Sequence, residues 1–177
     1  MKELKQAGIL LIVGIIIILA REYEFKHRAS ASPEIQGQAE LIRVIDGDTI
    51  VVNIDGKEEK IRIIGIDTPE SVKPNTPVEC FAQEATQEIT DFLAKPGILS
   101  ISTDPTQDSR DNYGRLLAHV FMNEINIGEH MIRDGYAYEY TYRDPYIYQL
   151  EYRAAEKEAR INKRGLWSAD SCNGKTA

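Results

Sequence analysis

Apolar and polar residues alternate from Glu40 onward in short runs rich in β-branched side chains, a pattern typical of strands. Asp55-Gly56 separates two of these runs and favours a tight hairpin, because a type I′ turn needs positive φ at both central positions. Strand alternation also places Ile61 and Arg62 on opposite faces of their strand. The predicted strands cover residues 41–45, 49–54, 60–64, 98–102 and 115–122.

A helical period replaces this alternation over residues 81–94, where apolar residues fall on one stripe. Lys95-Pro96-Gly97 follows and ends the predicted helix. A short second helix is expected to begin at Asn126, because Glu129 three residues further on completes a pattern that resembles a capping box. This helix should end near Gly135.

A third helix is predicted to open at Asp144 as its N-cap, with Pro145 at the first helical position. Gly165 suits its C-terminal cap. Its apolar residues recur at helical spacing and should face the core. They are Ile147, Leu150, Ala154 and Ile161.

Five strands, with one helix after the third and two after the fifth, predict an α+β fold. The expected architecture is a five-stranded Greek-key β-barrel of the oligonucleotide-binding (OB) type with about three helices. A chain of 177 residues has room for one such domain and an appendage. We place the domain at residues 39–168 and a C-terminal tail at residues 169–177.

The appendage is the N-terminal segment, residues 1–28, which contains an uninterrupted apolar run at positions 7–20. The length of the run suits a signal peptide. Charged residues follow it at once, however, where cleavage would require small side chains. We therefore favour an uncleaved single-pass membrane anchor, with a cleaved signal of a secreted protein as the alternative. Residues 29–38 would form a polar linker.

The two cysteines, Cys80 and Cys172, are too far apart in sequence to resemble a usual metal-binding pair. Two interpretations are open. They form a disulfide that ties the tail to the domain, as suits an exported protein, or they are two unrelated buried thiols. The disulfide interpretation favours a domain on the outer side of the cell membrane.

The charge of the chain argues against a protein that coats long nucleic acids. The formal net charge is −7. Residues 1–28 contain five Lys/Arg and three Asp/Glu, so residues 29–177 carry 16 basic and 25 acidic side chains and a formal charge of −9. Long-range attraction to a polyanion is therefore missing. A local cationic cleft beside a metal ion is still compatible with this composition.

Candidate metal ligands stand in two turns that follow predicted strands. Asp48 lies in Asp46-Gly47-Asp48, and Asp67 and Thr68 lie in Asp67-Thr68-Pro69. Two carboxylates and the Thr68 carbonyl form an oxygen-only set that suits Ca²⁺, with Mg²⁺ as the alternative, and disfavours zinc. Taken singly, each motif is equally compatible with ordinary turn chemistry.

Four further residues complete a candidate site for phosphodiester chemistry. Glu70 is a candidate general base for water, and Arg62 and Arg115 have the guanidinium fork that grips phosphate oxygens. Tyr113 is a candidate phosphate contact. Each has a plain structural alternative: surface positions for Glu70 and Arg62, packing for Tyr113, and an ion pair with Asp111 for Arg115.

The combined segments resemble the staphylococcal nuclease (thermonuclease) family. The similar segments span about residues 38–168 and include Val44–Thr49, Ile61–Glu70, Asp111–Ala118 and Leu166-Trp167. The resemblance implies a calcium-dependent nuclease on an OB-fold barrel that hydrolyses DNA and RNA and breaks the 5′ P–O bond. It also implies roles for individual residues. Asp48, Asp67 and the Thr68 carbonyl would bind metal, Arg62, Glu70 and Arg115 would be catalytic, and Tyr113 would lie near the phosphate.

The sequence therefore predicts a metal-dependent nuclease with DNA, RNA or both as substrate, a membrane contact through residues 1–28 and a monomeric domain. One rival is a nuclease-like barrel without catalytic activity that binds nucleic acid or protein. A second rival is an envelope protein in which the barrel is only a scaffold. Presence of Glu70 beside both arginines favours the enzyme, because binding alone does not require a water-activating carboxylate.

Overall fold

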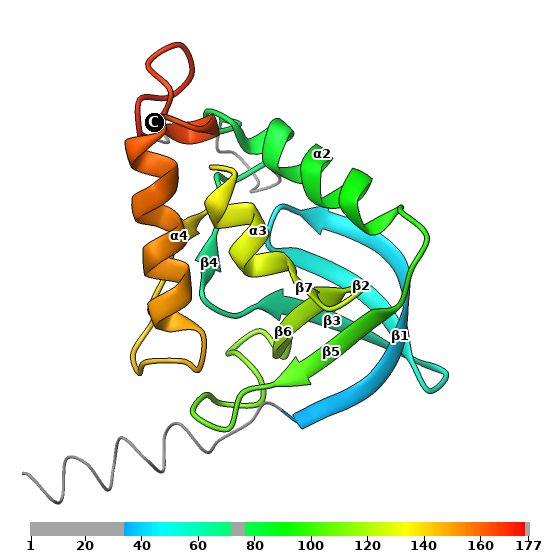
Figure 1. The fold of residues 1–177 in the computed structure, drawn as a ribbon. Coiled ribbons are helices and arrows are strands. Elements are labelled where there is room, and N and C mark those ends of the chain that lie inside the picture. Colours follow the sequence, from blue (N-terminus) through cyan, green and yellow to red (C-terminus); the bar gives the residue numbers. More distant parts are fainter. Residues whose placement is uncertain (1–33, 72–76, 176–177) are drawn as a thin grey trace, which may run out of the picture. The chain divides into compact units, whose positions relative to one another are not determined.

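Five strands close into a barrel in the computed structural model, which describes residues 34–71 and 77–175 (Figure 1). The strands follow the order β3-β2-β1-β5-β6, and a parallel pairing of β3 with β6 closes the barrel. The predicted OB-type α+β fold is therefore confirmed. The strands are β1 (Glu34–Asp46), β2 (Thr49–Ile54), β3 (Lys57–Ile63), β5 (Leu99–Thr103) and β6 (Leu116–Met122).

Strand β1 is longer than the sequence pattern indicates and serves two neighbours. Its first half pairs with β5 and its second half with β2, with register irregularities in both pairings. Residues 34–38, which the sequence analysis assigned to a linker, therefore belong to the barrel. Their backbone supplies the pairing, so the stretch needs no alternating apolar pattern to form a strand.

The core is built from the apolar faces of the barrel strands and of the helices. Ile61 is fully buried while the Arg62 side chain is 15% exposed, so the alternation predicted for this strand is confirmed. The largest fully buried apolar side chains come from every layer of the domain. They are Tyr152, Ile50, Ile61, Ile63, Ile66, Ile89, Ile101, Ile127, Met131, Ile132 and Leu166.

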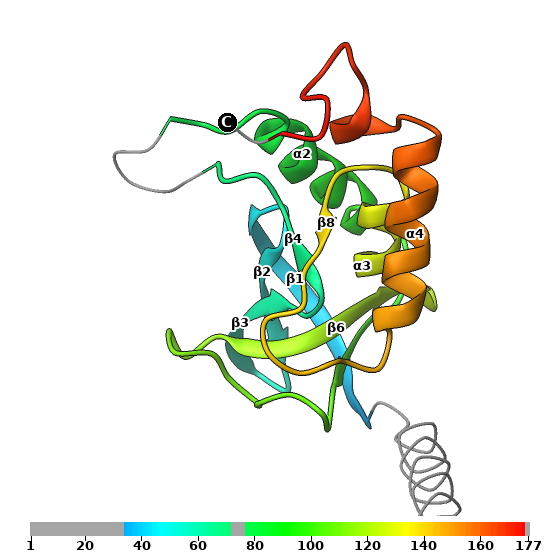
Figure 2. The same ribbon diagram turned by 90° about the vertical axis from the view of Figure 1, so that its left-hand side faces the viewer.

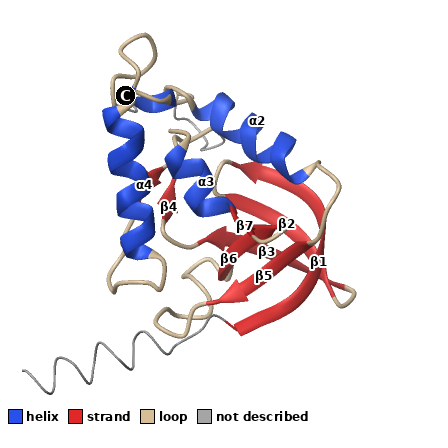
Figure 3. Cartoon of the chain, viewed as in Figure 1, coloured by secondary structure: helices blue, strands red, loops and turns tan. Residues whose placement is uncertain are grey.

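Three α-helices lie together along one side of the barrel (Figure 3). They are α2 (Ala82–Leu93), α3 (Ile127–Arg133) and α4 (Gln149–Ile161). The first two match the predicted helices closely. The Asn126 side chain accepts a hydrogen bond from the Glu129 backbone N–H at the start of α3, as the capping pattern predicts.

The start and the buried face of the third helix were predicted wrongly. Helix α4 begins at Gln149, and its buried residues are Gln149, Tyr152, Ala155 and Ala159. Leu150 and Ile161, which were expected in the core, are 73% and 69% exposed. Small alanines on this face permit close packing, and the Tyr152 ring fits over Gly128 of α3, where a Cβ would lie 2.3 Å from its hydroxyl oxygen. The prediction was wrong because it placed the largest aliphatic side chains in the core, whereas close packing against α3 favours small side chains on this face.

Gly165 does not cap α4, which ends at Ile161 with Asn162 as its C-cap. It starts the 3₁₀ helix η1 (Gly165–Trp167), where its backbone approaches Gly135. A Cβ on Gly165 would lie 2.4 Å from the Gly135 carbonyl oxygen, so only glycine fits there. The same contact lets the Leu166 N–H donate to the Gly135 carbonyl at 2.8 Å.

Two short pairings complete the strands: one extends the barrel sheet and one forms a separate two-stranded sheet. Strand β7 (Ile125–Asn126) pairs with β6, and β4 (Ile66–Asp67) pairs with β8 (Tyr138–Glu139). Figure 2 shows β4 and β8 side by side. Their register sets Ile66 opposite Glu139 and Asp67 opposite Tyr138. The pattern of the sequence did not predict these strands, because two residues are too few for a period.

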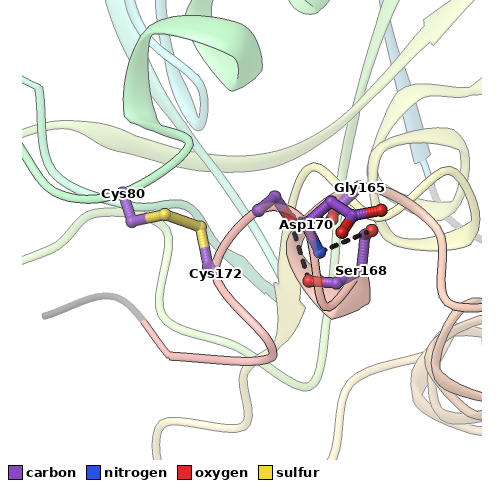
Figure 4. The surroundings of a disulfide bond; sticks show 6 residues. Cys80, Gly165, Ser168, Asp170 and Cys172 are labelled. Atoms are coloured by element: carbon purple, nitrogen blue, oxygen red, sulfur yellow. Dashed lines mark hydrogen bonds between the residues drawn. A yellow bond between two sulfur atoms is a disulfide. The ribbon is translucent and has the colours of Figure 1, made fainter.

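A disulfide joins Cys80 to Cys172 across 92 residues, with 5.9 Å between their Cα atoms (Figure 4). This is the first of the two interpretations that the sequence left open. Cys80 lies just before α2, and Cys172 lies in the segment expected to be a tail. That segment is bonded to the domain, since the Ser171 hydroxyl donates to the Gly165 carbonyl and the Gly174 N–H to the Leu166 carbonyl.

The predicted N-terminal apolar segment, residues 1–28, and the first part of the predicted linker lie outside the described residues. Within the described ranges, no helix has the length and apolar character needed to cross a membrane.

Candidate functional site

The turn between β1 and β2 presents Asp48, whose side chain is 9% exposed. Its Oδ2 accepts hydrogen bonds from the backbone N–H and the hydroxyl of Thr68, at 3.2 and 3.3 Å. Gly47 makes this contact sterically feasible, because a Cβ there would lie 2.8 Å from the Thr68 side chain. The two predicted metal-binding turns, 20 residues apart in sequence, are therefore packed against each other.

Arg62, near the end of β3, lies between two of the carboxylates. Its Nη2 is 3.0 Å from Asp48 Oδ2 and 3.0 Å from Asp67 Oδ1. Its Nη1 donates to the backbone carbonyls of Ile63 and Ile66, at 2.9 and 2.7 Å. One planar guanidinium thus fixes the curve of the chain from β3 into β4 and also holds both acids.

Asp67 ends the short strand β4 and has a side chain that is 54% exposed, in contrast to Asp48. The bend before β4 requires Gly65, which has φ +82°, and a Cβ there would lie 2.5 Å from the ring of Tyr146. This close approach seats β4 against the 138–146 segment, and the Tyr140 N–H donates to the Gly65 carbonyl at 3.0 Å. The bend therefore brings Asp67 back toward Asp48.

Arg115 follows a tight turn that Asp111 organises. Asp111 Oδ1 accepts from the backbone N–H groups of Tyr113 and Arg115, both at 2.9 Å, and its Oδ2 accepts from Arg115 Nε at 2.5 Å. Gly114 has φ +79°, which the turn requires and glycine adopts without strain. Tyr113 is 86% exposed, and the Arg115 guanidinium lies 5.5 Å from the centre of its ring.

Hydrogen bonds and ion pairs join these groups into one continuous chain. Arg115 Nη1 donates to Thr49 Oγ1 at 3.4 Å, and Thr49 Oγ1 donates to Asp48 Oδ1 at 2.9 Å. From Asp48 the chain continues to Arg62 and then to Asp67. We call this set of five residues the acid–arginine chain. The ion pair of Arg115 with Asp111 uses Nε, so it coexists with the contact to Thr49 instead of excluding it.

Barrel topology explains why residues so distant in sequence meet. Thr49 is the register partner of Arg62 in the β2–β3 pairing, and Arg62 is the partner of Leu117 in the parallel β3–β6 pairing. The Ile63 N–H also donates to the Asp48 carbonyl at 2.9 Å. The Asp46–Asp48 turn, the end of β3 and the start of β6 are therefore adjacent because the barrel closes.

Glu70, the candidate base, follows β4 by three residues and is held at its backbone. Its N–H donates to Glu79 Oε2 at 2.9 Å, and the N–H of Glu79 donates to the Glu70 carbonyl at 3.0 Å. The Glu70 side chain is partly exposed. Glu70 is thus connected to the acid–arginine chain by the short link through Thr68 and Pro69.

Burial and neighbouring negative charges raise the pKa values of two acids at the site. Burial, with the charge of Asp48 as the second cause, raises the pKa of Asp46 to about 6. Burial also raises the pKa of Asp67, against the opposing effect of Arg62. Desolvation disfavours the charged form of Asp111 as well, but its hydrogen bonds from Arg115 and the turn amides outweigh this and lower its pKa. The lowered pKa favours the ionised form of Asp111. The raised pKa values of Asp46 and Asp67 mean that a nearby positive charge would stabilise their ionised forms.

The oxygen set fits a hard cation. Asp48 Oδ2 and Asp67 Oδ1 lie at equal distances from a single positively charged nitrogen of Arg62, so both carboxylates already converge on a cation. The Thr68 N–H and hydroxyl face Asp48, and carboxylates together with a backbone carbonyl are the kind of oxygen ligands that calcium and magnesium prefer. Over residues 34–71 and 77–175, no group of three or more His, Cys, Asp or Glu side chains is arranged as a metal site. The candidate set of two carboxylates and one backbone carbonyl contains only two such side chains.

Sequence reasoning missed the residues that support the site. Thr49 links Arg115 to Asp48, and Glu79 holds Glu70. Asp111 was considered only as a competitor for Arg115, although its carboxylate builds the turn. An Asp two residues before a turn amide is a signal that would have found it, because such side chains bond the backbone two residues on. No signal in the sequence points to Thr49 or Glu79.

A closed OB-type barrel that carries paired carboxylates and two arginines beside one turn defines a class of small barrel proteins with an acid–arginine site. Comparison with known proteins shows the family to which the chain belongs. The sequence model of the family "Staphylococcal nuclease homologue" matches residues 60–169. The chain belongs to the staphylococcal nuclease family.

Similar relatives cover most of the chain. The thermonuclease of Staphylococcus hyicus is 35% identical over 165 residues, which span 91% of this chain and 96% of the relative. The thermonuclease of Staphylococcus intermedius is 32% identical over 166 residues, with 90% and 95% covered. Endonuclease YncB of Bacillus subtilis (strain 168) is 34% identical over 155 residues, with 84% and 72% covered.

Proposed function

We propose that this protein is a nuclease that hydrolyses phosphodiester bonds of DNA, RNA or both in a calcium-dependent reaction. Its membership of the family and the names of its relatives support the nuclease. The observation that carries the assignment of residues is the acid–arginine chain. It links Asp48, Asp67, Arg62 and Arg115 through contacts of 2.9 to 3.4 Å, although they come from three separate parts of the sequence.

In this proposal Asp48, Asp67 and the Thr68 carbonyl hold the cation, with calcium preferred and magnesium as the alternative. A bound divalent cation supplies positive charge that stabilises the negative charge developing on the phosphate. The burial of Asp48 and the exposure of Asp67 suit a site that is fixed on one side and open to a substrate on the other.

Arg62 and Arg115 bind the phosphate oxygens. Both guanidinium groups are oriented by the protein before substrate arrives, Arg62 by two backbone carbonyls and Arg115 by Asp111. Orientation in advance matters because charge stabilisation in the transition state costs less when the donors do not need to reorganise. Tyr113 projects beside Arg115, where an exposed ring and hydroxyl meet the same phosphate.

Glu70 takes the proton from the attacking water. A carboxylate near a cation and a bound phosphate orients that water and makes it more nucleophilic by accepting its proton. Such base catalysis typically contributes roughly 10²- to 10⁴-fold. Two hydrogen bonds between Glu79 and the Glu70 backbone fix the point from which the Glu70 side chain extends.

The proposal is tested by incubating the purified full-length protein with plasmid DNA and with RNA, in calcium, in magnesium or in a chelator. Cleavage that requires calcium and stops with the chelator is the expected result. Binding of either nucleic acid without cleavage under every metal condition would contradict the proposal and favour the catalytically inactive binding module. Magnesium-only cleavage would reassign the cation while leaving the reaction in place.

We also propose that residues 1–28 anchor the protein in the cell membrane with a monomeric nuclease domain outside the cell; this domain was expected at residues 39–168 and begins at residue 34 in the structure. The apolar run with charged flanks and the Cys80–Cys172 disulfide support this placement, because disulfides persist in oxidising compartments. Cell fractionation followed by protease treatment of intact cells tests it. Recovery from the culture medium of a chain shortened at its N-terminus would favour the secreted alternative.

A further inference from the structure

Glu70 and Glu79 are joined by two backbone-directed hydrogen bonds, and we call this pair the Glu70–Glu79 clasp. The Glu79 carboxylate accepts from the Glu70 N–H at 2.9 Å, and the Glu70 carbonyl accepts from the Glu79 N–H at 3.0 Å. Because there are two bonds, the segments that carry Glu70 and Glu79 cannot rotate about a single hydrogen bond. The first bond has an ionised acceptor, which makes it stronger than a neutral amide–carbonyl bond.

The clasp is anchored by a covalent bond. Cys80 follows Glu79 directly, and its disulfide to Cys172 connects the clasp to the C-terminal segment. The Glu79 carbonyl also accepts from the Ala82 N–H at 3.2 Å, at the start of α2. Glu79 is therefore fixed by the disulfide and by the start of α2, whereas Glu70 is fixed by the preceding strand β4.

The C-terminal segment is itself fixed to the site side of the domain. The Asn173 N–H donates to the Ser168 carbonyl at 2.9 Å, which closes the turn that contains Cys172. The Trp167 ring packs edge-on against Tyr138, with centroids 5.1 Å apart. Tyr138 is the register partner of Asp67 in the β4–β8 pairing. The segment that carries Cys172 thus also supports the strand from which Glu70 follows.

We propose that Glu79 is a positioning residue for Glu70 and that the Cys80–Cys172 disulfide keeps Glu79 in place, so that turnover depends on the redox state of this disulfide. The inference rests on the proposed function, because it takes Glu70 as the base. When a dithiol reductant acts, the S–S bond breaks and two thiols form. The reductant supplies two electrons and two protons and becomes a disulfide itself.

A specific pattern of effects distinguishes positioning from a general contribution to stability. Loss of the clasp displaces the base but breaks no hydrogen bond or ion pair of the acid–arginine chain, since none of these involves Glu79. Besides burial, the Glu79 charge acts on Asp67 and raises its pKa, so calcium affinity must be compared between variants that lack the same charge. A displacement of about 1 Å in a reacting group lowers rates by up to roughly 10²-fold, so turnover should fall beyond any effect of the lost charge.

The first test compares variants of Glu79 in the full-length protein. Glu79→Ala should lower kcat roughly 10- to 100-fold below that of Glu79→Gln, while titration calorimetry gives both variants the same calcium Kd because both lack the charge that acts on Asp67. Glu79→Gln retains an acceptor oxygen and should recover most of the lost turnover. Glu84→Ala is the matched control, because it removes the same charge from an exposed position in the first turn of α2 and should keep full turnover.

A second readout observes the clasp directly. Hydrogen exchange of the Glu70 backbone N–H, followed by NMR, should accelerate in Glu79→Ala and not in Glu84→Ala, because the bond from this N–H to the Glu79 carboxylate is lost. Unchanged exchange would show that the clasp does not restrain Glu70 and would overturn the inference, whatever the turnover.

The third test concerns the disulfide. The double variant C80A/C172A, and wild type treated with a dithiol reductant, should each lose turnover to a similar extent as Glu79→Ala. Adding Glu79→Ala to C80A/C172A should cause little further loss, because both changes act through one position. Full additivity of the two effects would overturn the link between disulfide and clasp. If C80A/C172A does not fold, wild type and Glu79→Ala decide instead, each measured with and without the dithiol reductant: reduction should lower the turnover of wild type and change that of Glu79→Ala little, and an equal loss in both would overturn the link.

Glu70→Gln in the same assays separates the two levels of the proposal. If Glu70→Gln keeps full turnover, the assignment of the base fails and the inference fails with it. If Glu70→Gln loses turnover while folded Glu79→Ala matches wild type, only the inference fails. A parallel loss of turnover, calcium affinity and thermal stability in Glu79→Ala would show a merely structural role and would also overturn it.

Discussion

The two parts of the candidate site are held in different ways. Asp48, Arg62 and Arg115 stand on or beside strands of the closed barrel, and pairing with neighbouring strands fixes their positions. Glu70 stands beyond the two-residue strand β4 and depends on the clasp with Glu79 and on a disulfide. Strand pairing in the barrel positions the candidate metal and phosphate groups, whereas the candidate base lies on a segment that the clasp and the disulfide connect to the domain.

This difference has a consequence for how the site responds to change. Strand pairing and core packing are cooperative, so the acid–arginine chain should persist until the domain unfolds. Contacts that hold a single segment open locally at a lower free energy than the global one. Turnover should therefore be separable from metal affinity at Glu70, and less so at the residues on the barrel.

The largest effect is expected from Arg115→Lys, which should lower turnover roughly 10³- to 10⁵-fold, as for an arginine that stabilises a phosphoryl-transfer transition state. Lysine supplies a single ammonium group and cannot bond Asp111 and Thr49 while also presenting a fork to phosphate. Single-turnover kinetics at saturating substrate measure the loss. Arg43→Lys, on the exposed face of β1, is the control, and a fully active Arg115→Lys would refute the fork argument.

Glu70→Gln should lower turnover roughly 10²- to 10⁴-fold, because the amide cannot accept the proton from water. Turnover should fall far more than calcium or substrate affinity, since the Glu70 charge acts on Asp67 but Glu70 is not one of the residues of the acid–arginine chain. Calorimetric titration with calcium and steady-state kinetics on one substrate provide the comparison. Equal losses in turnover and in calcium affinity would place Glu70 among the metal ligands instead and remove the contrast between the two parts.

A smaller effect, on stability alone, is expected at a buried network away from both parts. Asp104 accepts hydrogen bonds from His119, from the Ile147 N–H and from Thr106, and so ties the start of the loop after β5 to the segment before α4. Burial disfavours its charged form, but these bonds outweigh burial and lower the pKa of Asp104 to about 2.

Because this pKa is depressed in the folded state, the stabilisation from Asp104 is present above the unfolded pKa and is lost as pH falls through the folded one. Asp104→Asn should therefore cost roughly 2 kcal/mol of unfolding free energy near neutral pH, with the difference from wild type shrinking below about pH 4. Urea unfolding at several pH values measures it. A pH-independent difference would contradict the linkage, and the folded variant should keep wild-type turnover at neutral pH.

The smallest effect should come from Arg110, which braces the turn before Arg115 from outside. It forms a two-bond ion pair with Glu59, at 2.9 and 3.0 Å, and donates to the Gly114 carbonyl at 2.9 Å. Exposed pairs typically contribute 0.2 to about 1 kcal/mol, so Arg110→Ala should lower turnover by no more than about fivefold. Glu59→Gln should behave alike, and a loss as large as that of Arg115→Lys would mean that the barrel part is held as weakly as Glu70.

Much of the fold followed from local chemistry. The hairpin at Asp55-Gly56, the helix over residues 81–94 and the Asn126 cap were all predicted, because each depends on residues close in sequence. The errors came where the partner was remote. The buried face of α4 is chosen by the room that Gly128 leaves for Tyr152, and residues 34–38 become a strand because β5 lies beside them.

The sequence by itself determined which residues are candidates for the chemistry, since carboxylates in turns and nearby arginines suggest metal and phosphate contacts once their motifs are combined. It also left the two cysteines with two explanations. Only the tertiary structure decided that Thr49 relays between Arg115 and Asp48, that Arg62 serves two acids at once, and that Glu79 and Cys172 support Glu70. The physical reason is that each of these contacts joins segments brought together by barrel closure or by the disulfide, and local patterns contain no information on such distant partners.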